Sequence, residues 1–292
     1  MRIAVVGIPG AWSSELLADA VEKRTGQRCL IGMDQFSCDL VSGRVTAGNW
    51  NLESFDAVIV KKISVEYSPH VLDRLEMLRF LEARGVRIFS SPAHLLGLID
   101  RLSCTVTLRA AGIPMPPTTI TESIEDAAAA VARYGEAIAK PMYSTKARGM
   151  EVLRPGGDLL DRLRVFRAAG NPVLYLQKKL TLPGRDLGLA FLGGRHLGAY
   201  ARVAGKGAWN TTILAGGRYE PVVPPADIVA LAHRAQAVFG LDFTGVDIVE
   251  TEEGPLVLEV SAFGGFRGLV EASNVDPAAR YVDHVIEELS HA

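Results

Sequence analysis

The chain is poor in the residues that hold small secreted or zinc-stabilised domains together. Only three of its 292 residues are cysteines, an odd number without CxxC spacing, which argues against a disulfide framework or a structural zinc site. Its six histidines show no HxxxH or HExxH spacing, so a metal held by imidazoles has no support. These absences predict a protein of a reducing compartment, the cytoplasm.

Long apolar runs and an excess of one charge are also missing. No apolar run approaches the roughly 20 residues of a membrane span, and the N-terminal run stops at residues 7–10 (Gly-Ile-Pro-Gly) without the charged start of a signal peptide. The formal net charge of -2 gives no nucleic-acid footprint. We therefore expect a soluble globular protein of two or three lobes, with neither a membrane nor a nucleic acid as partner.

Residues 245–260 have the pattern of a β-hairpin. Two runs rich in Val, Ile and Leu flank a polar Thr-Glu-Glu-Gly turn. A three-residue loop would place Asp247 opposite Glu259 and Val249 opposite Val257, all on one face. Facing carboxylates repel by up to about 1 kcal/mol on an exposed sheet, and Mg²⁺ between them removes that cost. The pattern predicts a metal site, with an acidic, solvated hairpin edge as the alternative.

The first 91 residues alternate short apolar strands with helices, which predicts a small open α/β sheet. The glycine spacing after the first strand is GxxG and not the GxGxxG of dinucleotide-binding sites. We therefore favour a loop that tightens a strand–helix corner over a nicotinamide site. The expected strands are residues 2–6, 55–60 and 86–89, with helices from residue 13 or 14 and at 72–84.

The rest of the chain is predicted to contain more hairpins and several amphipathic helices. One hairpin is expected at residues 137–153, where a polar loop with two cations joins the strands. Another joins strands 187–191 and 196–203 through the Gly193-Gly194 turn. Helices are expected at residues 92–111, 123–134, 159–168, 226–239 and 278–289, and a further strand at 173–177.

Several short motifs follow the N-terminal region in a fixed order. They are Asp100-Arg101, Ile-Ala-Lys140, a loop ending in Gly149, Tyr-Leu-Gln177, Gly184-Arg-Asp186, Arg202, Gly-Val-Asp247 and Leu-Val-Leu-Glu259-Val. This order resembles the ATP-grasp superfamily, and within it the RimK-like amino-acid ligases. The resemblance covers nearly the whole chain and is most specific around Asp247 and Glu259. A closer resemblance, to the ATP-grasp protein of the so-called GAK gene system, is a further expectation.

The resemblance implies an α/β ATP-grasp fold built from three parts. An N-terminal pre-ATP-grasp α/β domain with a small open sheet is expected at residues 1–91. A central ATP-grasp lobe with a lid loop is expected at residues 92–175. A C-terminal lobe with an antiparallel sheet and the metal-binding hairpin is expected at residues 176–292.

The resemblance also assigns roles to individual residues. Lys140 would reach the phosphates of ATP and Arg202 would face the γ-phosphate or an acyl-phosphate, so both are expected to act in catalysis. From the residues alone, Lys140 is better explained as a solvated charge at a strand end. Asp247 and Glu259, with Ser261, are implied as ligands of Mg²⁺, with Mn²⁺ as an alternative cation. The other residues implied to bind ATP are Arg101, the lid-loop residues Ser144, Thr145, Lys146, Arg148 and Gly149, the adenine-holding hinge Gln177, Lys178, Lys179 and Leu180, and Asp186 near the ribose.

The chain departs from the family pattern at several of these motifs. Arg101 stands where the family usually has lysine, and Gly188 stands where it has an arginine. Asn210 and Thr212 replace an arginine and an asparagine, and Ser261 replaces an asparagine after the second metal carboxylate. We expect the two lid cations to supply the charge that is missing at Gly188.

The resemblance implies an ATP-dependent carboxylate–amine ligase that forms an acyl-phosphate, ADP and phosphate. Its substrates are expected to be small-molecule or peptide carboxylates and amines, and a homo-oligomer is compatible with the sequence. Residues 12–14 and 263–267 are expected to recognise the acceptor, because a glycine-rich run admits close approach of a ligand and Arg267 can pair with a carboxylate. The departures leave a second interpretation open, a regulatory nucleotide-binding protein with little or no turnover.

Overall fold

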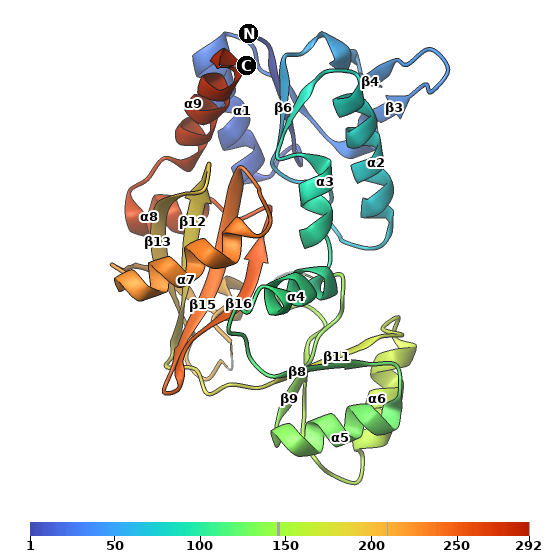
Figure 1. Ribbon diagram of the computed structural model, residues 1–292, viewed down its shortest axis with the longest axis vertical. Coiled ribbons are helices and arrows are strands. Elements are labelled where there is room, and N and C mark those ends of the chain that lie inside the picture. The colour runs from blue at the N-terminus through green and yellow to red at the C-terminus, as the bar shows by residue number, and fades with distance from the viewer. Residues whose placement is uncertain (145–146, 209, 292) are drawn as a thin grey trace.

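The structure, a computed structural model, describes residues 1–144, 147–208 and 210–291. The described chain is a mixed α/β protein with four sheets (Figure 1). The N-terminal sheet lies at the top of the view, a five-stranded sheet in the middle and a smaller lobe at the bottom. The predicted α/β class with an antiparallel C-terminal sheet is confirmed.

The N-terminal region folds into the predicted parallel sheet, with strand order β2-β1-β6-β7. Every residue of β1 and β6 is buried, as expected for parallel strands that are covered on both faces. A three-stranded antiparallel sheet of β3, β4 and β5 is inserted after β2 and is not among the predicted elements. The elements are β1 (Ile3–Val6), α1 (Trp12–Thr25), β2 (Leu30–Ile31), β3 (Phe36–Cys38), β4 (Val45–Ala47), β5 (Trp50–Asn51), β6 (Ala57–Val60), α2 (His70–Ala83) and β7 (Arg87–Phe89).

The single helix predicted at residues 92–111 is wrong, because the structure has two helices there. A short α3 (Pro92–Leu95) and a 3₁₀ turn (Leu96–Leu98) precede α4 (Arg101–Ala110). Asp100 has an extended backbone, and its Oδ1 accepts a hydrogen bond from the Ser103 N–H at 2.8 Å. A carboxylate that caps the first turn starts a new helix at this position.

The central lobe is a four-stranded antiparallel sheet of order β10-β9-β11-β8, with two helices packed on it. Its predicted hairpin is confirmed, since β9 and β10 pair antiparallel. β8 was not predicted, because its four Thr- and Ile-containing positions are all half-buried and show no alternation. The elements are β8 (Thr118–Thr121), α5 (Ile124–Tyr134), β9 (Ala137–Ala139), β10 (Glu151–Leu153), α6 (Leu159–Ala168) and β11 (Leu174–Lys178).

The C-terminal lobe is a five-stranded antiparallel sheet of order β14-β13-β12-β15-β16. Both predicted hairpins are present, and β14 and α8 are additional elements. The elements are β12 (Arg185–Leu192), β13 (Arg195–Val203), β14 (Arg218–Pro221), α7 (Ala226–Ala237), β15 (Phe243–Thr251), β16 (Gly254–Ser261), α8 (Arg267–Ser273) and α9 (Pro277–Ser290).

The register of the β15–β16 hairpin differs from the predicted one near its turn. The connection has two residues and not three, so Val249 faces Leu256, and the predicted pairing with Val257 is wrong. An irregularity follows, where Leu258 is the extra residue of a β-bulge on β16. The bulge compensates for the shorter turn, and Asp247 therefore faces Glu259 as predicted.

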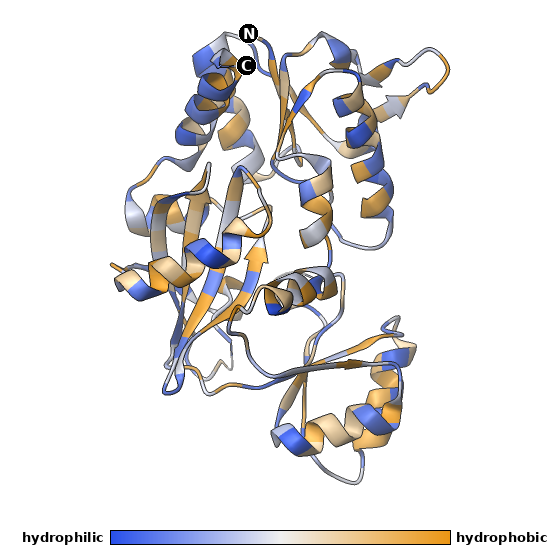
Figure 2. Ribbon diagram, viewed as in Figure 1, coloured by the Kyte–Doolittle hydropathy of each residue, from blue (hydrophilic) through white to orange (hydrophobic). Residues whose placement is uncertain are grey.

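The described residues form three hydrophobic cores, and two of these combine residues of the N-terminal and five-stranded sheets. α9 packs against α1, which places the two chain ends close together at the top of Figure 1. The third core is built from residues 124–176 alone and lies within the central lobe. Figure 2 shows apolar residues along the strands, with polar stripes on the helices.

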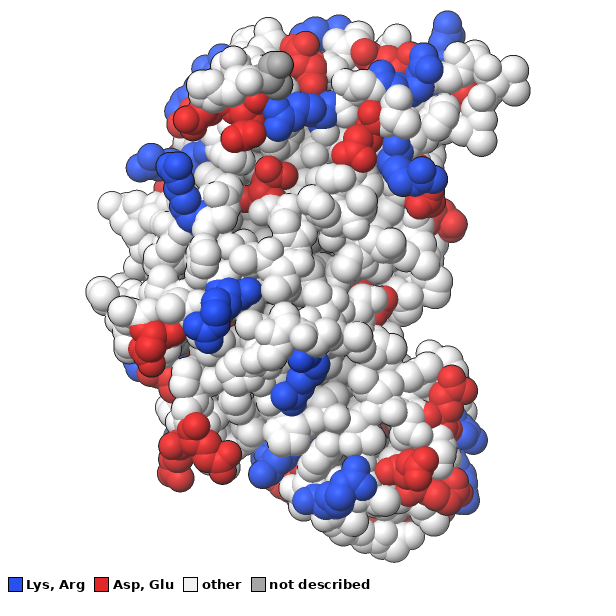
Figure 3. All heavy atoms as spheres, in the orientation of Figure 1, with Lys and Arg blue, Asp and Glu red and all other residues white. Residues whose placement is uncertain are grey.

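The surface carries charges of both signs. On the face drawn in Figure 3, Lys and Arg are interspersed with Asp and Glu. Within the described residues, no helix combines the length and the apolar character that crossing a bilayer requires.

Candidate active site

The two carboxylates predicted to bind metal belong to a row of residues that crosses the five-stranded sheet. Tyr200 of β13 faces Gly188 of β12, Gly188 faces Asp247 of β15, and Asp247 faces Glu259 of β16. Directly opposed residues share a face of the sheet. A Cβ atom at Gly188 would lie only 2.5 Å from two ring carbons of Tyr200. The tyrosine ring therefore covers Gly188 on the side of the carboxylates.

Arg202 connects this row with the next one. It faces Asp186 across β12 and β13, and its Nε donates to the two carboxylate oxygens of Asp186 at 3.1 and 3.2 Å. Its Nη2 also lies 2.7 Å from Oδ2 of Asp247. Burial lowers the pKa of Arg202, but Asp247 and Asp186 raise it further, so this guanidinium stays charged. One cation thus holds two carboxylates.

Asp247 is held in an environment that disfavours its charge. Burial raises its pKa to about 7, with Asp186 and Glu259 adding to the rise and Arg202 opposing it. The side chain of Asp247 is 18% exposed, whereas that of Glu259 is 48% exposed. The pair consequently has one carboxylate inside the site and one at its rim.

The Asp247–Glu259 pair fits a cation that arrives with phosphate ligands. Among the described residues, no group of three or more His, Cys, Asp or Glu side chains is arranged to hold a metal ion. Mg²⁺ is commonly bound by one or two carboxylates, with nucleotide phosphates and water completing its octahedron. Ser261 stands two residues after Glu259 on β16, so its hydroxyl belongs to the same face. These residues suit Mg²⁺ bound with a nucleotide better than a cage made of protein alone.

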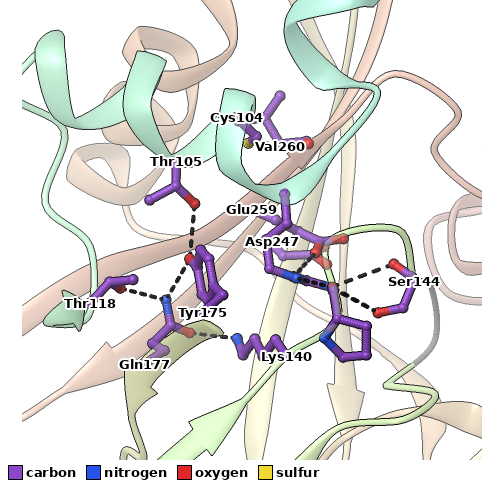
Figure 4. Close-up of polar contacts among 12 residues, drawn as sticks. Cys104, Thr105, Thr118, Lys140, Ser144, Tyr175, Gln177, Asp247, Glu259 and Val260 are labelled. Atoms are coloured by element: carbon purple, nitrogen blue, oxygen red, sulfur yellow. Dashed lines mark hydrogen bonds and ion pairs between the residues drawn. The ribbon is translucent and has the colours of Figure 1, made fainter. Parts of the chain in front are cut away.

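Lys140 follows β9 and is buried, contrary to a solvated charge at a strand end. Its Nζ donates to Oε1 of Gln177, and its backbone N–H donates to the carbonyl of Tyr175 at 3.0 Å (Figure 4). The amide of Gln177 donates in turn to the hydroxyls of Thr118 at 3.2 Å and Tyr175 at 3.4 Å. Burial, and then the charge of Arg101, lowers the pKa of Lys140 to about 7. A buried amine with one neutral partner is poised to take an anion.

Arg101 joins the central lobe to β16, the strand that carries Glu259. Its Nη1 lies 3.5 Å from Oε2 of Glu259, and its Nη2 lies 3.3 Å from Oγ of Ser144 at the start of the lid loop. Its Nε also donates to the carbonyl of Pro141 at 3.2 Å. The side chain is only 9% exposed, and Figure 4 shows Ser144 and Glu259 on the same side of the Lys140–Gln177 network.

The remaining lid-loop and hinge residues are placed as follows. Arg148 and Gly149 are exposed, and Thr145 and Lys146 lie outside the described residues. In the hinge, the N–H of Lys178 donates to the carbonyl of Pro117 at 2.8 Å, and the N–H of Lys179 donates to Glu136 at 2.9 Å. Adenine recognition by the segment from Gln177 to Leu180 would therefore have to use its other backbone groups.

The two segments expected to recognise an acceptor lie together. The guanidinium carbon of Arg267, the first residue of α8, lies 5.4 Å from the ring centroid of Trp12, the first residue of α1. Beneath them, Lys61 donates to the Gly264 carbonyl at 2.6 Å and lies 4.0 Å from the ring centroid of Phe266. Burial, and then Lys62, lowers the pKa of Lys61 to about 7.

Sequence similarity decides the family. Residues 99–285 match the RimK-like ATP-grasp domain family. The chain belongs to this family. A tetrahydromethanopterin:α-L-glutamate ligase of Methanosarcina acetivorans is 27% identical over 270 residues, which cover 82% of each chain. A probable α-L-glutamate ligase of Pectobacterium carotovorum is 26% identical over 98% of this chain and 94% of its own.

Solved structures support the same fold. The ATP-grasp ligase PsnB, complexed with a minimal precursor, superposes with a TM-score of 0.76 at 22% identity over 99% of both chains. The D-cycloserine synthetase DcsG superposes with a TM-score of 0.73 at 20% identity, over 98% of this chain and 99% of its own. A further PsnB structure contains Mg and ADP. The RimK-like ATP-grasp protein described here is thus a ligase of a family that uses ATP and Mg²⁺. The closer resemblance to the GAK gene system stays a prediction.

Residues that matter to this RimK-like ATP-grasp site were missed from the sequence. Tyr200, Tyr175 and Lys61 were not singled out. A glycine inside a strand often marks a close approach of another group, and Gly188 was a usable signal of this kind. The structure also shows that an arginine cannot be accommodated at Gly188 while Tyr200 keeps its position.

Proposed function

We propose that this ATP-grasp ligase joins a carboxylate to an amine through an acyl-phosphate, with ADP and phosphate as products. The arrangement that supports this best is Arg101, which contacts both the rim carboxylate Glu259 and the lid-loop residue Ser144. Arg101 thereby connects the central lobe, which carries the buried Lys140, with the strand that carries Glu259 opposite Asp247. That combination of cations and paired carboxylates suits a nucleotide triphosphate with its metal.

The roles of the protein groups follow from their charges. Lys140 binds the phosphates. Burial disfavours the charged form of this lysine, and a nearby phosphate raises its pKa so that it keeps its proton. Arg202 stabilises the negative charge on the transferred phosphoryl group while Asp186 holds the guanidinium in place. Bound Mg²⁺ would supply a second positive charge at Asp247 and Glu259. The substrate carboxylate attacks the γ-phosphorus and ADP leaves, and the amine then displaces phosphate from the acyl carbon.

We propose an α-amino acid such as L-glutamate as the amine substrate. The curated relatives include α-L-glutamate ligases. On this chain, Arg267 beside Trp12 offers an exposed cation that suits a free carboxylate of such an acceptor. The carboxylate partner, which is activated by phosphorylation, is a small molecule or a peptide.

The experiment is a matrix of carboxylates and amines, with L-glutamate in every amine set, assayed for ATP-dependent phosphate release. We expect release that requires both partners, together with an amide product seen by mass spectrometry. Hydroxylamine in place of the amine should trap the acyl-phosphate as a hydroxamate. Tight MgATP binding with no release in any combination would favour the regulatory nucleotide-binding protein instead.

A further inference from the structure

The aromatic ring of Tyr200 is enclosed by parts of the C-terminal lobe that have made room for it. A Cβ atom at Gly188 would lie 2.5 to 2.7 Å from Cε2, Cζ and Oη of the ring. A Cβ atom at Gly268, in α8, would lie 2.6 to 2.7 Å from other ring carbons. Tyr219 closes a third side, edge-on at a centroid distance of 5.2 Å. Two glycines and an aromatic edge thus fix the plane of this ring.

The hydroxyl end of the ring lies over Gly188, on the way to the strand that carries Asp247. Tyr200 extends from β13 across Gly188, and the next residue in that row is Asp247. The atoms of Tyr200 nearest to a Cβ at Gly188 are Cε2, Cζ and Oη, at the far end of the side chain. The phenol oxygen therefore lies beyond the strand that carries Tyr200 and next to the strand that carries the metal carboxylate.

The hydroxyl of Tyr200 has no protein partner among the described residues, and it is not sealed from solvent. Among the described residues, Oη of Tyr200 takes part in no hydrogen bond with a side chain or with the backbone. Within that part of the chain, the fully buried polar side-chain atom left unpaired is Nε2 of His284 and not Oη of Tyr200, and Tyr200 as a whole is half-buried. A phenol that is rigidly held, accessible and unpaired beside Asp247 is available to a ligand.

We propose that Tyr200 is a catalytic residue whose hydroxyl donates a hydrogen bond to the transferred phosphoryl group. This inference rests on the proposed function, because it names a group that acts at the same γ-phosphate. A phenol is neutral below its ordinary pKa of about 10, so it can donate to a phosphate oxygen without placing another charge beside Arg202. The hydroxyl thus adds a neutral hydrogen-bond donor to the cations around the phosphoryl group. The contact requires only the hydroxyl of Tyr200.

The decisive variant is Tyr200→Phe, which keeps the ring between the two glycines and removes the donor. Binding of ADP with Mg²⁺ should change by less than about twofold. Beryllium fluoride, which mimics the γ-phosphoryl group on bound ADP, should tighten parental ADP binding by a factor that falls about ten- to a hundredfold in the variant, the size of one hydrogen bond to a charged group. Calorimetric titration gives both quantities without any turnover.

Tyr134→Phe is the matched control. Its hydroxyl is bonded to Thr119 at 2.7 Å in the central lobe, so the substitution removes one tyrosine hydroxyl outside the proposed phosphoryl contact. Both binding constants should stay parental in this variant, and both variants should unfold near the parental temperature. A parental beryllium fluoride effect in Tyr200→Phe, or no such effect in the parent protein that binds ADP, would overturn the proposal.

Product formation separates this inference from the proposed function. If ligation occurs, Tyr200→Phe should lower kcat about ten- to a hundredfold with little change in KM for ATP. If no carboxylate and amine are joined by the parent, the proposed function fails. The beryllium fluoride titration still decides whether Tyr200 contacts the phosphoryl position.

Discussion

At the scale of single residues, the cations and carboxylates of the candidate site are paired with one another. Arg202 lies between Asp186 and Asp247, and Arg101 lies 3.5 Å from Glu259. A bound triphosphate with its metal presents the opposite partners, phosphate to the arginines and a cation to the carboxylates. Nucleotide binding would therefore exchange partners within the site, and the buried Asp186 is the group that keeps Arg202 in position during the exchange.

The first prediction concerns the metal carboxylates. Asp247→Asn or Glu259→Gln should each lower Mg²⁺-dependent turnover by more than about tenfold, because each removes one anionic ligand. The fold should survive, since Arg202 keeps Asp186 and Arg101 keeps its bonds to Pro141 and Ser144. For Glu259→Gln, the free energy of unfolding should fall by no more than about 1–2 kcal/mol, because Glu259 is half exposed and the buried Arg101 keeps its bonds to Pro141 and Ser144. Unchanged turnover in both variants, with normal thermal unfolding, would rule out this metal site.

The second prediction concerns the proton of Lys140. Burial, and then Arg101, lowers its pKa to about 7, whereas a lysine in the unfolded chain titrates near 10.4. Between these values the unfolded chain holds a proton that the folded protein has released, so stability rises with pH over this window. Below about pH 7, the folded protein bears the full cost of a buried charge.

Lys140→Met should therefore raise the free energy of unfolding of the nucleotide-free protein more at pH 6.5 than at pH 10. The difference should be on the order of 4 kcal/mol, because the folded and unfolded pKa values lie about three units apart, and denaturant unfolding at both pH values measures it. The same variant should bind ATP about ten- to a hundredfold more weakly at pH 6.5. A stability difference that does not vary with pH would mean that the ammonium of Lys140 is solvated. An unchanged ATP affinity of the variant would mean that Lys140 does not contact the phosphates.

At the same scale, the residues themselves predicted the paired acids of the candidate site better than its lysine, which the residues alone described as solvated, and better than its neutral groups. Asp247 and Glu259 could be paired from strand alternation and an assumed turn, and the β-bulge restored this pairing although the turn is one residue shorter. Tyr200 could not, because an aromatic in a strand is ordinarily a packing residue. Its position depends on two missing side chains, those of Gly188 and Gly268, which come from separate elements. The sequence does not show that these elements pack against one another, so it could not reveal this contact.

At the scale of elements, periodicity predicted the long helices and the buried strands. β1 and β6 are apolar at every position, and α5 begins at a serine that accepts from Asp126 N–H. Strands of two residues, such as β2 and β5, are too short to show alternation. The helix break at Asp100 depends on a capping bond, and the register of the β15–β16 hairpin depends on a two-residue turn together with a bulge at Leu258. Local geometry settled these two cases.

The third prediction tests how β12, β13 and α8 pack around one ring. Gly188→Arg should lower the free energy of unfolding by about 1–3 kcal/mol, because any side chain at this position displaces Tyr200. It should also fail to raise turnover, although the family resemblance implies an arginine there. Gly265→Ala is the control, since a Cβ there meets nothing within 4 Å. Parental stability for Gly188→Arg would mean that Tyr200 leaves its place easily, and equal losses in both variants would point to a general intolerance of substitution.

At the scale of the whole molecule, the cores divide the chain unevenly. Buried residues of the N-terminal and five-stranded sheets share two cores, and α1 packs on α9. The central lobe has a core of its own, built from residues 124–176. Its ties to the remainder include polar contacts of the site, notably Thr105 with Tyr175 at 2.9 Å and Arg101 with Ser144. The part of the chain that carries Lys140 is thus a small body attached to a larger one.

The last prediction follows from this division. Amides of α5, α6, β9 and β10 should exchange with deuterium through a sub-global opening of lower free energy than the amides of β1, β6 and β15, because a small core stabilises its lobe less. A nonhydrolysable ATP analogue with Mg²⁺ binds through both bodies, so it should slow exchange in the central lobe more than in β1 and β6. Lys140→Met should remove most of this extra protection, whereas Tyr134→Phe should preserve it. Equal protection of all these elements without nucleotide, or an equal gain in all of them with it, would show that the molecule opens as a single cooperative unit.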